Sequence, residues 1–348
     1  MTEARAKARQ WIEAVKRGEN PRDASTGDDS FGVIVEQFLQ HHVAKQRQAK
    51  SVMRLIRKEL LPKWHSKPLA SISKKDVLAI IDEITARGAP YQARALLRQI
   101  KVFFGWAIER GYLETSPADR LKASRLIGPA AARQRVLDDT ELAAFWRAVG
   151  RTPYPMGPLL RLLLLSGQRR SEVAEAKWHE FDLSKKLWVI PQERHKSDVA
   201  HTVPLTADML ALLEKLPRWK SGDFLFSTNG GKKPVNGWTK CKREIDHRML
   251  LTLKALARKN GTDPRSVTLP PFVLHDVRRT VRTRLSSLRI DDAVSEVAIG
   301  HGKKGLARVY NQHRYLDEVR EAFNSWNRLL RGIIEPASNV VVLRGATR

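Results

Sequence analysis

A short basic connector, LKASRLIGPAAARQ at positions 121–134, divides the chain into two halves of different character. Before it, successive segments carry apolar residues at helical spacing, with Lys and Arg between them. After it, helical segments are interrupted by two short strand-like runs, at 187–190 and 202–205. We therefore expect an all-helical domain followed by a mixed α/β domain, which makes the protein mainly α with a small β-sheet.

Turn signals and linker composition set the predicted boundaries. Gly18 and the Asn20-Pro21 pair end an N-terminal helix, and the polar run RDASTGDDS that follows is typical of a linker. We expect six parts in this order: an N-terminal helix at 1–21, a linker at 22–30, a four-helix domain at 31–120, a linker at 121–134, a second domain at 135–333, and a C-terminal tail at 334–348.

The tail carries an apolar, β-branched run at 339–343, beyond the last predicted helix and a Pro-containing connector. An extended run of this kind can add a strand to the edge of another sheet. We expect it to dock in trans, onto a neighbouring protomer, with an unordered tail as the alternative.

The charge of the chain favours a polyanionic partner. Lys and Arg number 63 against 37 Asp and Glu, a formal net charge of +26. Hydrophobic residues make up 42% of the chain, which is enough for a buried core and excludes global disorder. On composition alone, a basic protein that binds nucleic acid without specificity is the alternative.

Cysteine usage and hydropathy indicate the compartment. The single cysteine, Cys241, cannot form an intramolecular disulfide, and no Cys/His cluster has the spacing of a zinc site. No apolar stretch is long enough to span a bilayer, and the N-terminus lacks a secretory signal. We expect a cytoplasmic protein with no membrane partner, metal or cofactor.

Five short elements after the connector carry the residue types that attack a phosphodiester. Their candidate residues are, in chain order, Arg169 in SGQR, Lys196, His275 and Arg278 in HDVR, His301 in GH, and Tyr310. An arginine fork stabilises two phosphate oxygens and keeps its charge. Nearby cations favour the phenolate form of a tyrosine, which is then a usable nucleophile. The set predicts DNA cleavage by a tyrosine without a metal.

Each element alone has an ordinary structural explanation, such as a solvated surface side chain, a packed ring or a helix cap. Three candidates also have neighbours of the same type that could replace them: Lys185 and Lys186 for Lys196, Arg279 for Arg278, and Tyr315 for Tyr310. We favour Arg278 over Arg279 because its spacing from His275 puts both on one helical face.

Two longer motifs extend this pattern to a family. LHDVRRT at 274–280 and IGHGKKGLARVYNQHRYLDEVREAFNSWNRLL at 299–330 resemble the tyrosine recombinases, or phage integrase family. The similarity is closest to the integrases of satellite phages and genomic islands, and it covers about residues 30–333. The resemblance implies a helical core-binding domain and a mixed α/β catalytic domain that clamp DNA as a C shape.

The resemblance also implies a role for each candidate residue. The implied roles are phosphate binding by Arg169 and Arg278, acid–base assistance by His275, a hydrogen bond to a non-bridging oxygen from His301, general acid catalysis by Lys196, and formation of a 3′-phosphotyrosyl bond by Tyr310. Because the covalent bond keeps the energy of the phosphodiester, strand exchange would need neither ATP nor metal.

The implied activity is integration and excision of a mobile element at attachment sites in double-stranded DNA. Four protomers would exchange strands through a Holliday junction, with the free protein a monomer or weak oligomer in the nucleoid. A DNA-bending accessory protein is a further expected partner. Two other functions fit the same sequence: a catalytically silent regulator that binds attachment-like sites, and a type IB topoisomerase-like nicking-closing enzyme.

The chain departs from the family pattern in two respects. Ser166 stands where the pattern often has Thr, close to Arg169. The satellite-phage subgroup also usually has an arm-binding domain of about ninety residues before the core-binding domain. Residues 1–21 match only its last helix, so the chain is either naturally short or truncated at its start, and arm-site binding stays open.

Overall fold

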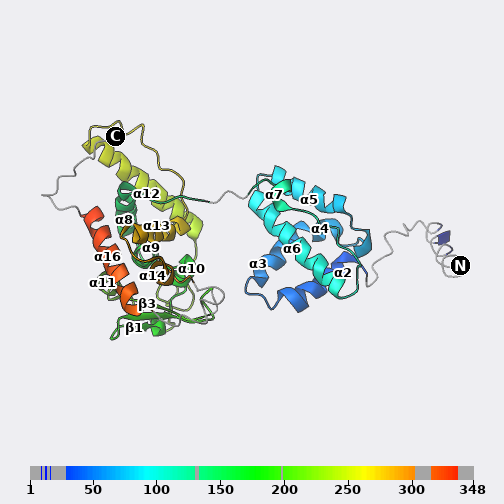
Figure 1. Ribbon diagram of the computed structural model, residues 1–348, viewed down its shortest axis with the longest axis horizontal. Coiled ribbons are helices and arrows are strands. Elements are labelled where there is room, and N and C mark those ends of the chain that lie inside the picture. Colours follow the sequence, from blue (N-terminus) through cyan, green and yellow to red (C-terminus); the bar gives the residue numbers. More distant parts are fainter. Residues whose placement is uncertain are drawn as a thin grey trace. The chain divides into compact units, whose positions relative to one another are not determined.

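The computed structural model describes residues 29–129, 133–196, 199–301 and 315–335, together with four single positions before residue 29. The chain forms two compact units, Met1–Ala132 and Arg133–Arg348 (Figure 1). Helices dominate both units, and the strands of the described ranges form one small sheet. The predicted fold class, mainly α with a small β-sheet, is confirmed. Tyr310 and the tail run at 339–343 lie outside the described residues.

The first unit is helical throughout its described part. Its elements are α2 (Phe31–Phe38), the π-helix η1 (Leu39–Val43), α3 (Ala49–Glu59), α4 (Leu61–Trp64), the 3-10 helix η2 (Leu69–Ser71), α5 (Lys74–Ala86), α6 (Pro90–Glu109) and α7 (Ala123–Leu126). Ser73 and Asp76 form a capping box at the start of α5, each side chain bonding the backbone N–H of the other.

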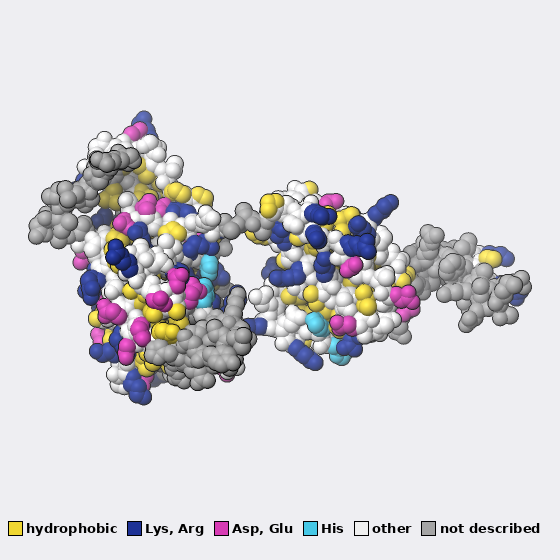
Figure 2. Space-filling view, in the orientation of Figure 1, with side chains coloured by type: hydrophobic (Ala, Val, Ile, Leu, Met, Phe, Trp, Pro, Cys, Tyr) yellow, Lys and Arg dark blue, Asp and Glu magenta, His cyan; other side chains and the backbone are white. Residues whose placement is uncertain are grey.

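Aromatic rings fill the core of this unit. Phe31 of α2 meets Trp64 and Phe103 edge-on, with ring centroids 5.2 Å apart in both pairs. Phe38 makes similar contacts with Phe103 and Trp106, at 5.4 Å. Edge-to-face pairs add stabilisation to the area that the rings bury. The core leaves the outer helix faces to charged residues, and Lys and Arg are spread over the visible face in Figure 2.

Helix α3 ends at Glu59, and Pro62 lies in the first turn of the next helix, α4. Proline is tolerated there because the first N–H groups of a helix have no intrahelical acceptor.

The second unit combines helices with a three-stranded sheet. Its elements are α8 (Asp139–Gly150), α9 (Met156–Ser166), α10 (Arg170–Ala174), η3 (Trp178–Glu180), β1 (Phe181–Asp182), β2 (Leu187–Ile190), β3 (His201–Pro204), α11 (Ala207–Leu213), α12 (Trp238–Lys259), α13 (Leu274–Ser287), α14 (Asp292–Ala298) and α16 (Leu316–Ile334).

The sheet is antiparallel, in the order β1-β2-β3, and lies at one edge of the unit (Figure 1). β2 and β3 are the two predicted strands, with Leu187 opposite Pro204 and Ile190 opposite His201. β1 was not predicted, since two residues are too few to show an alternation. Its Phe181 ring stacks on Trp188 of β2, with centroids 5.1 Å apart.

Helix α9 is the centre of the second unit. Every residue from Leu162 to Ser166 is buried, and α8, α11, α13 and α16 all pack on this helix. The last helix returns to it, because Trp326 of α16 donates from its indole N–H to the carbonyl of Leu164 at 3.0 Å. The end of α9 is thus held on several sides, and the candidate residues begin directly after it.

Candidate active site

A tight turn after α9 places the first candidate arginine. Gly167 has a left-handed backbone, with φ of 62°, and a Cβ there would lie 2.9 Å from a methyl of Val281. Glycine is therefore required for both conformation and space. The buried side chain of Gln168 donates to the carbonyl of Ala298 at 2.8 Å. The turn is fixed to α13 and α14, so Arg169 starts from a rigid position.

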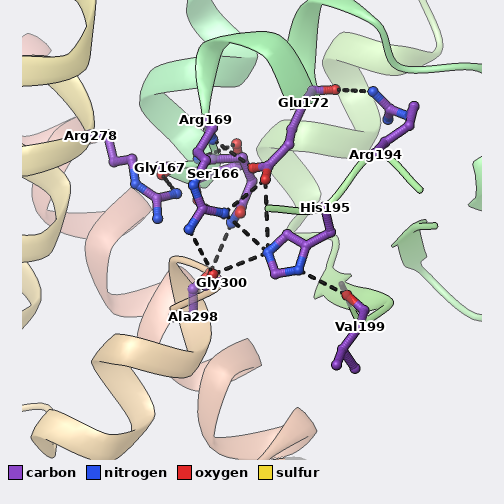
Figure 3. A network of polar contacts seen from close by, with 11 residues as sticks. Ser166, Gly167, Arg169, Glu172, Arg194, His195, Val199, Arg278, Ala298 and Gly300 are labelled. Carbon is purple, nitrogen blue, oxygen red and sulfur yellow. Dashed lines mark hydrogen bonds and ion pairs between the residues drawn. The ribbon is translucent and has the colours of Figure 1, made fainter. Parts of the chain in front are cut away.

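The Arg169 guanidinium is held by three groups (Figure 3). Nη1 donates to Oε1 of Glu172 at 2.8 Å and lies 3.1 Å from Nε2 of His195. Nη2 donates to the carbonyl of Gly300 at 3.0 Å. Glu172 is buried and also accepts from the Arg169 backbone N–H at 2.9 Å. The arginine therefore keeps one orientation before any ligand binds, although 17% of its side chain stays exposed.

Arg278 enters the same region from α13 and is almost fully buried. Its Nη1 donates to the carbonyl of Gly167 at 3.0 Å, while Nη2 is buried without a hydrogen-bond partner among the described residues. Burial, with the Arg169 cation adding to it, lowers the pKa of Arg278 to about 9. A buried cation with an unused donor is costly by itself, and a bound anion would offset that cost.

His195, which contacts Arg169, stacks on a second histidine, His201. The rings of His195 and His201 are 5.1 Å apart between centroids, and both are buried. Burial, and next the adjacent His195, lowers the pKa of His201 to about 3, so this ring is neutral near pH 7. A Cβ on Gly300 would lie 2.9 Å from atoms of each ring, so the carbonyl that Arg169 contacts requires glycine at that position.

His275 lies in the first turn of α13, which Asp276 anchors by accepting from the Val273 backbone N–H at 2.9 Å. The His275 residue is exposed, and partial desolvation followed by the nearby Arg278 and Arg279 lowers its pKa. It is thus favoured as a neutral imidazole, which can accept a proton.

His275 shares an open groove of about 810 Å³ with two other candidates. The groove is lined by these charged or aromatic residues among others: Arg169, Arg170, Lys196, Trp238, Lys242, Arg243, Asp246 and His275. Lys196 is exposed in the turn between β2 and β3. The positive lining fits a polyanion better than a small apolar ligand.

His301 directly follows Gly300 after α14 and is exposed. Its Nδ1 pairs with the Glu296 carboxylate, and its backbone N–H donates to the Glu296 carbonyl at 2.8 Å. Desolvation lowers the pKa of His301, and the Glu296 hydrogen bond opposes that change. Since Arg169 contacts Gly300, the structure brings His301 to the arginine pair, although 132 residues separate it from Arg169.

The structure thus brings Arg169, Lys196 and His275 together in the groove. Arg278 donates to the carbonyl of Gly167, two residues before Arg169, and His301 follows Gly300, whose carbonyl accepts from Arg169. Tyr310 falls outside the described residues. Three buried residues next to this set were not among the predicted site residues: Glu172 and His195, which contact Arg169, and His201, which stacks on His195. Glu172 could have been found from the GQRRSE spacing, and His195 from its place beside Lys196, but a buried role for His201 had no local signal.

The described ranges of the chain contain no group of three or more His, Cys, Asp or Glu side chains arranged to hold a metal ion. They also contain no helix that is both long and apolar enough to cross a membrane.

Models of two protein domains match the chain. The model of the phage integrase family matches residues 135–316, and the model of the phage integrase central domain matches residues 31–124. The first match alone covers more than half of the chain. It contains Arg169, Lys196, both residues of the HDVR motif, His301 and Tyr310.

Curated relatives and solved structures agree with this match. Prophage integrase IntZ of Escherichia coli K12 is 26% identical over 97% of this chain and 81% of its own length. The integrase of Enterobacteria phage P4 is 25% identical over 94% and 76%.

Among solved structures, the fold is similar to a lambda integrase dimer bound to a COC′ core site (TM-score 0.57, 20% identity, 81% of this chain and 77% of that one). It is also similar to the Tn1549 transposon integrase in complex with a circular intermediate DNA (TM-score 0.59, 15% identity, 84% and 98%). The chain belongs to the phage integrase family and is a tyrosine site-specific recombinase.

Proposed function

We propose that this recombinase integrates and excises a mobile element by cutting and rejoining DNA through a covalent 3′-phosphotyrosyl intermediate. The observation that carries the proposal is the pair of prearranged guanidinium groups, Arg169 and Arg278, of which Arg278 is buried with an unused donor and a lowered pKa. Such a pair is suited to the two non-bridging oxygens of one phosphate.

In this mechanism the two arginines stabilise the charge that builds on the phosphate as it is attacked. Groups held in place beforehand need not reorganise at that moment, which makes electrostatic stabilisation of this kind a large catalytic contribution. Here the Arg169 fork is fixed by Glu172 and Gly300, and Arg278 by Gly167.

The remaining candidates supply the proton transfers and the nucleophile. Tyr310 attacks phosphorus, and His275, exposed and favoured as neutral, takes up a proton. Lys196 protonates the leaving 5′-oxygen, and His301 donates to a non-bridging oxygen. Because the phosphotyrosyl bond conserves the energy of the phosphodiester, religation needs no ATP, and the protein's own cations supply the charge stabilisation.

The partner in this proposal is double-stranded DNA. The net charge of +26 and the basic lining of the groove support it. We assign residues 31–120 to a core-binding domain and 135–333 to the catalytic domain, which together clamp the DNA as a C shape. One solved relative is a lambda integrase tetramer bound to a Holliday junction. By analogy, we propose a tetramer on DNA here, with the run at 339–343 docking in trans and a DNA-bending protein assisting.

Covalent trapping tests the chemistry. Wild type and Tyr310→Phe are incubated with nicked suicide substrates that span the ends of the element, with EDTA present, and the products are separated on a denaturing gel. A protein–DNA adduct that needs Tyr310 and persists in EDTA is expected, and its position maps the cleavage site. Tyr315→Phe is the matched control and should still form the adduct.

Other outcomes would point to the two alternative functions. Specific DNA binding with no adduct from wild type would replace the proposal by a catalytically silent regulator. Relaxation of supercoiled DNA by a monomer, on any sequence, would replace it by a topoisomerase-like enzyme.

A further inference from the structure

We propose that His195 is a positioning residue that decides which edge of the Arg169 guanidinium faces the DNA. The inference rests on the proposed function, since it assigns phosphate binding to Arg169. His195 is 3% exposed and follows β2 in the same turn as the exposed Lys196. Its ring points towards Arg169 and Gly300 (Figure 3).

The contacts of the His195 ring define its hydrogen-bonding roles. Nδ1 lies 2.8 Å from the carbonyl oxygen of Val199, which can only accept, so Nδ1 carries a hydrogen. Nε2 lies 3.1 Å from Nη1 of Arg169, which can only donate, and 3.1 Å from the carbonyl oxygen of Gly300, which can only accept. In the neutral ring that carries its hydrogen on Nδ1, Nε2 is an acceptor, and the hydrogen bond to it comes from Nη1 of Arg169. The Val199 carbonyl therefore selects the tautomer that Arg169 requires.

Two contacts bind the end of the guanidinium side by side. His195 Nε2 and the carbonyl oxygen of Gly300 lie 3.1 Å apart, and they face Nη1 and Nη2 of Arg169 respectively. The second hydrogen of Nη1 goes to Glu172. Three of the five N–H donors of Arg169 are thus committed to protein groups.

The two uncommitted donors lie on one edge. In a planar guanidinium, Nε–H and one Nη2–H point to the same side, with the spacing of two carboxylate or phosphate oxygens. Neither has a hydrogen-bond partner among the described residues, whereas Nη1 is fully used. With its end edge bound to His195 and Gly300, Arg169 presents the Nε–Nη2 edge to the scissile phosphate.

Without the His195 acceptor, the Arg169 guanidinium would no longer be restricted to this orientation. Nη1 would lack one partner, and the guanidinium could rotate towards Glu172, which would turn the free edge away from the phosphate. A displacement of about 1 Å at a reacting group can cost about 100-fold in rate. Overall DNA affinity depends on many phosphate contacts and should hardly change.

The test compares two variants of similar size. His195→Leu removes the acceptor, while His195→Gln keeps an acceptor at about the position of Nε2. We expect the single-turnover rate of adduct formation to fall about 10- to 100-fold in His195→Leu. In His195→Gln most of that loss should be recovered. DNA affinity and melting temperature are measured for both variants.

A double-mutant cycle separates positioning from packing. Lys has no second edge to orient, so His195→Leu should cost little further rate in an Arg169→Lys background. Additive losses would overturn the inference, as would a wild-type rate in His195→Leu. An equal loss in His195→Gln and His195→Leu, at equal melting temperature, would also overturn it by assigning the effect to packing on His201. Failure of wild type to form a Tyr310-dependent adduct would instead count against the proposed function.

Discussion

The Arg278 guanidinium donates to the carbonyl of Gly167 at 3.0 Å, across 111 positions of sequence. This bond joins α13 to the turn after α9, and through that turn to Arg169. It uses one donor nitrogen of a buried cation and leaves Nη2 without a described partner. The two arginines are therefore arranged as one unit, with part of the hydrogen-bonding capacity left for a ligand.

The burial of this cation predicts a conflict between stability and activity. Because burial lowers the pKa of Arg278 to about 9, its charge destabilises the DNA-free fold. Arg278→Met removes the charge at similar length, so the melting temperature without DNA should rise. Adduct formation should fall by at least about 100-fold, the usual cost of removing a donor that stabilises the transition state. Arg328→Met, exposed on α16, is the control and should change neither quantity. A lower melting temperature in Arg278→Met would contradict this account.

A second prediction concerns Glu172, which holds Arg169 in position. Its two carboxylate oxygens accept from the backbone N–H and Nη1 of Arg169, and glutamine can replace only one of these acceptors. Glu172→Gln should slow adduct formation about 10-fold or more and destabilise the fold by roughly 1–2 kcal/mol. Glu175→Gln, exposed just after the same short helix, serves as the control in the same cleavage and melting assays. Unchanged cleavage in Glu172→Gln would show that Arg169 needs no carboxylate partner.

The lowered pKa of His201 predicts how the stability of the fold depends on pH. Its folded pKa is about 3, while the unfolded ring takes up a proton near pH 6.5. Between these values the unfolded state binds more protons, so stability falls as pH decreases, by on the order of 1 kcal/mol per pH unit. His201→Gln should flatten this part of the stability profile.

Denaturant unfolding at pH 7 and pH 5 measures that change. The exposed residue His247 gives the control, since His247→Gln should keep the acid sensitivity of wild type. If His201→Gln loses stability with acid as steeply as wild type, other groups are responsible.

The position of Arg243 in the groove predicts that it contributes to the salt dependence of DNA binding. It is exposed near the start of α12 and lines the groove that contains Arg169 and His275. Arg243→Gln should weaken binding to all sequences alike and reduce the slope of log K against log salt by about 1, as for one lost phosphate contact. Arg258→Gln, at the far end of the same helix, should leave the slope unchanged. Fluorescence anisotropy across a salt series provides both slopes.

The sequence alone determined the fold class and the family. Helical periodicity before the connector and two strand-like runs after it predicted a mainly α protein with a small sheet. These signals are local, because a helix or strand shows its buried face through spacing along a few turns. Ordered motifs identified the family although each motif alone was ambiguous. The local signals failed at β1, whose pairing with β2 depends on a partner strand.

Only the tertiary structure decided which groups hold the catalytic candidates in place. Sequence spacing could suggest that Arg169 and Arg278 act together, but not that Arg278 bonds Gly167 while Arg169 bonds Gly300. It also could not show that His195 turns inward while its neighbour Lys196 stays exposed. Such contacts join segments separated by 26 to 131 residues, and they form only when α9, α13 and α14 pack together. Short sequence motifs contain the residue types that the chemistry needs. The burial, orientation and pKa of these residues depend on the neighbours that folding brings to them.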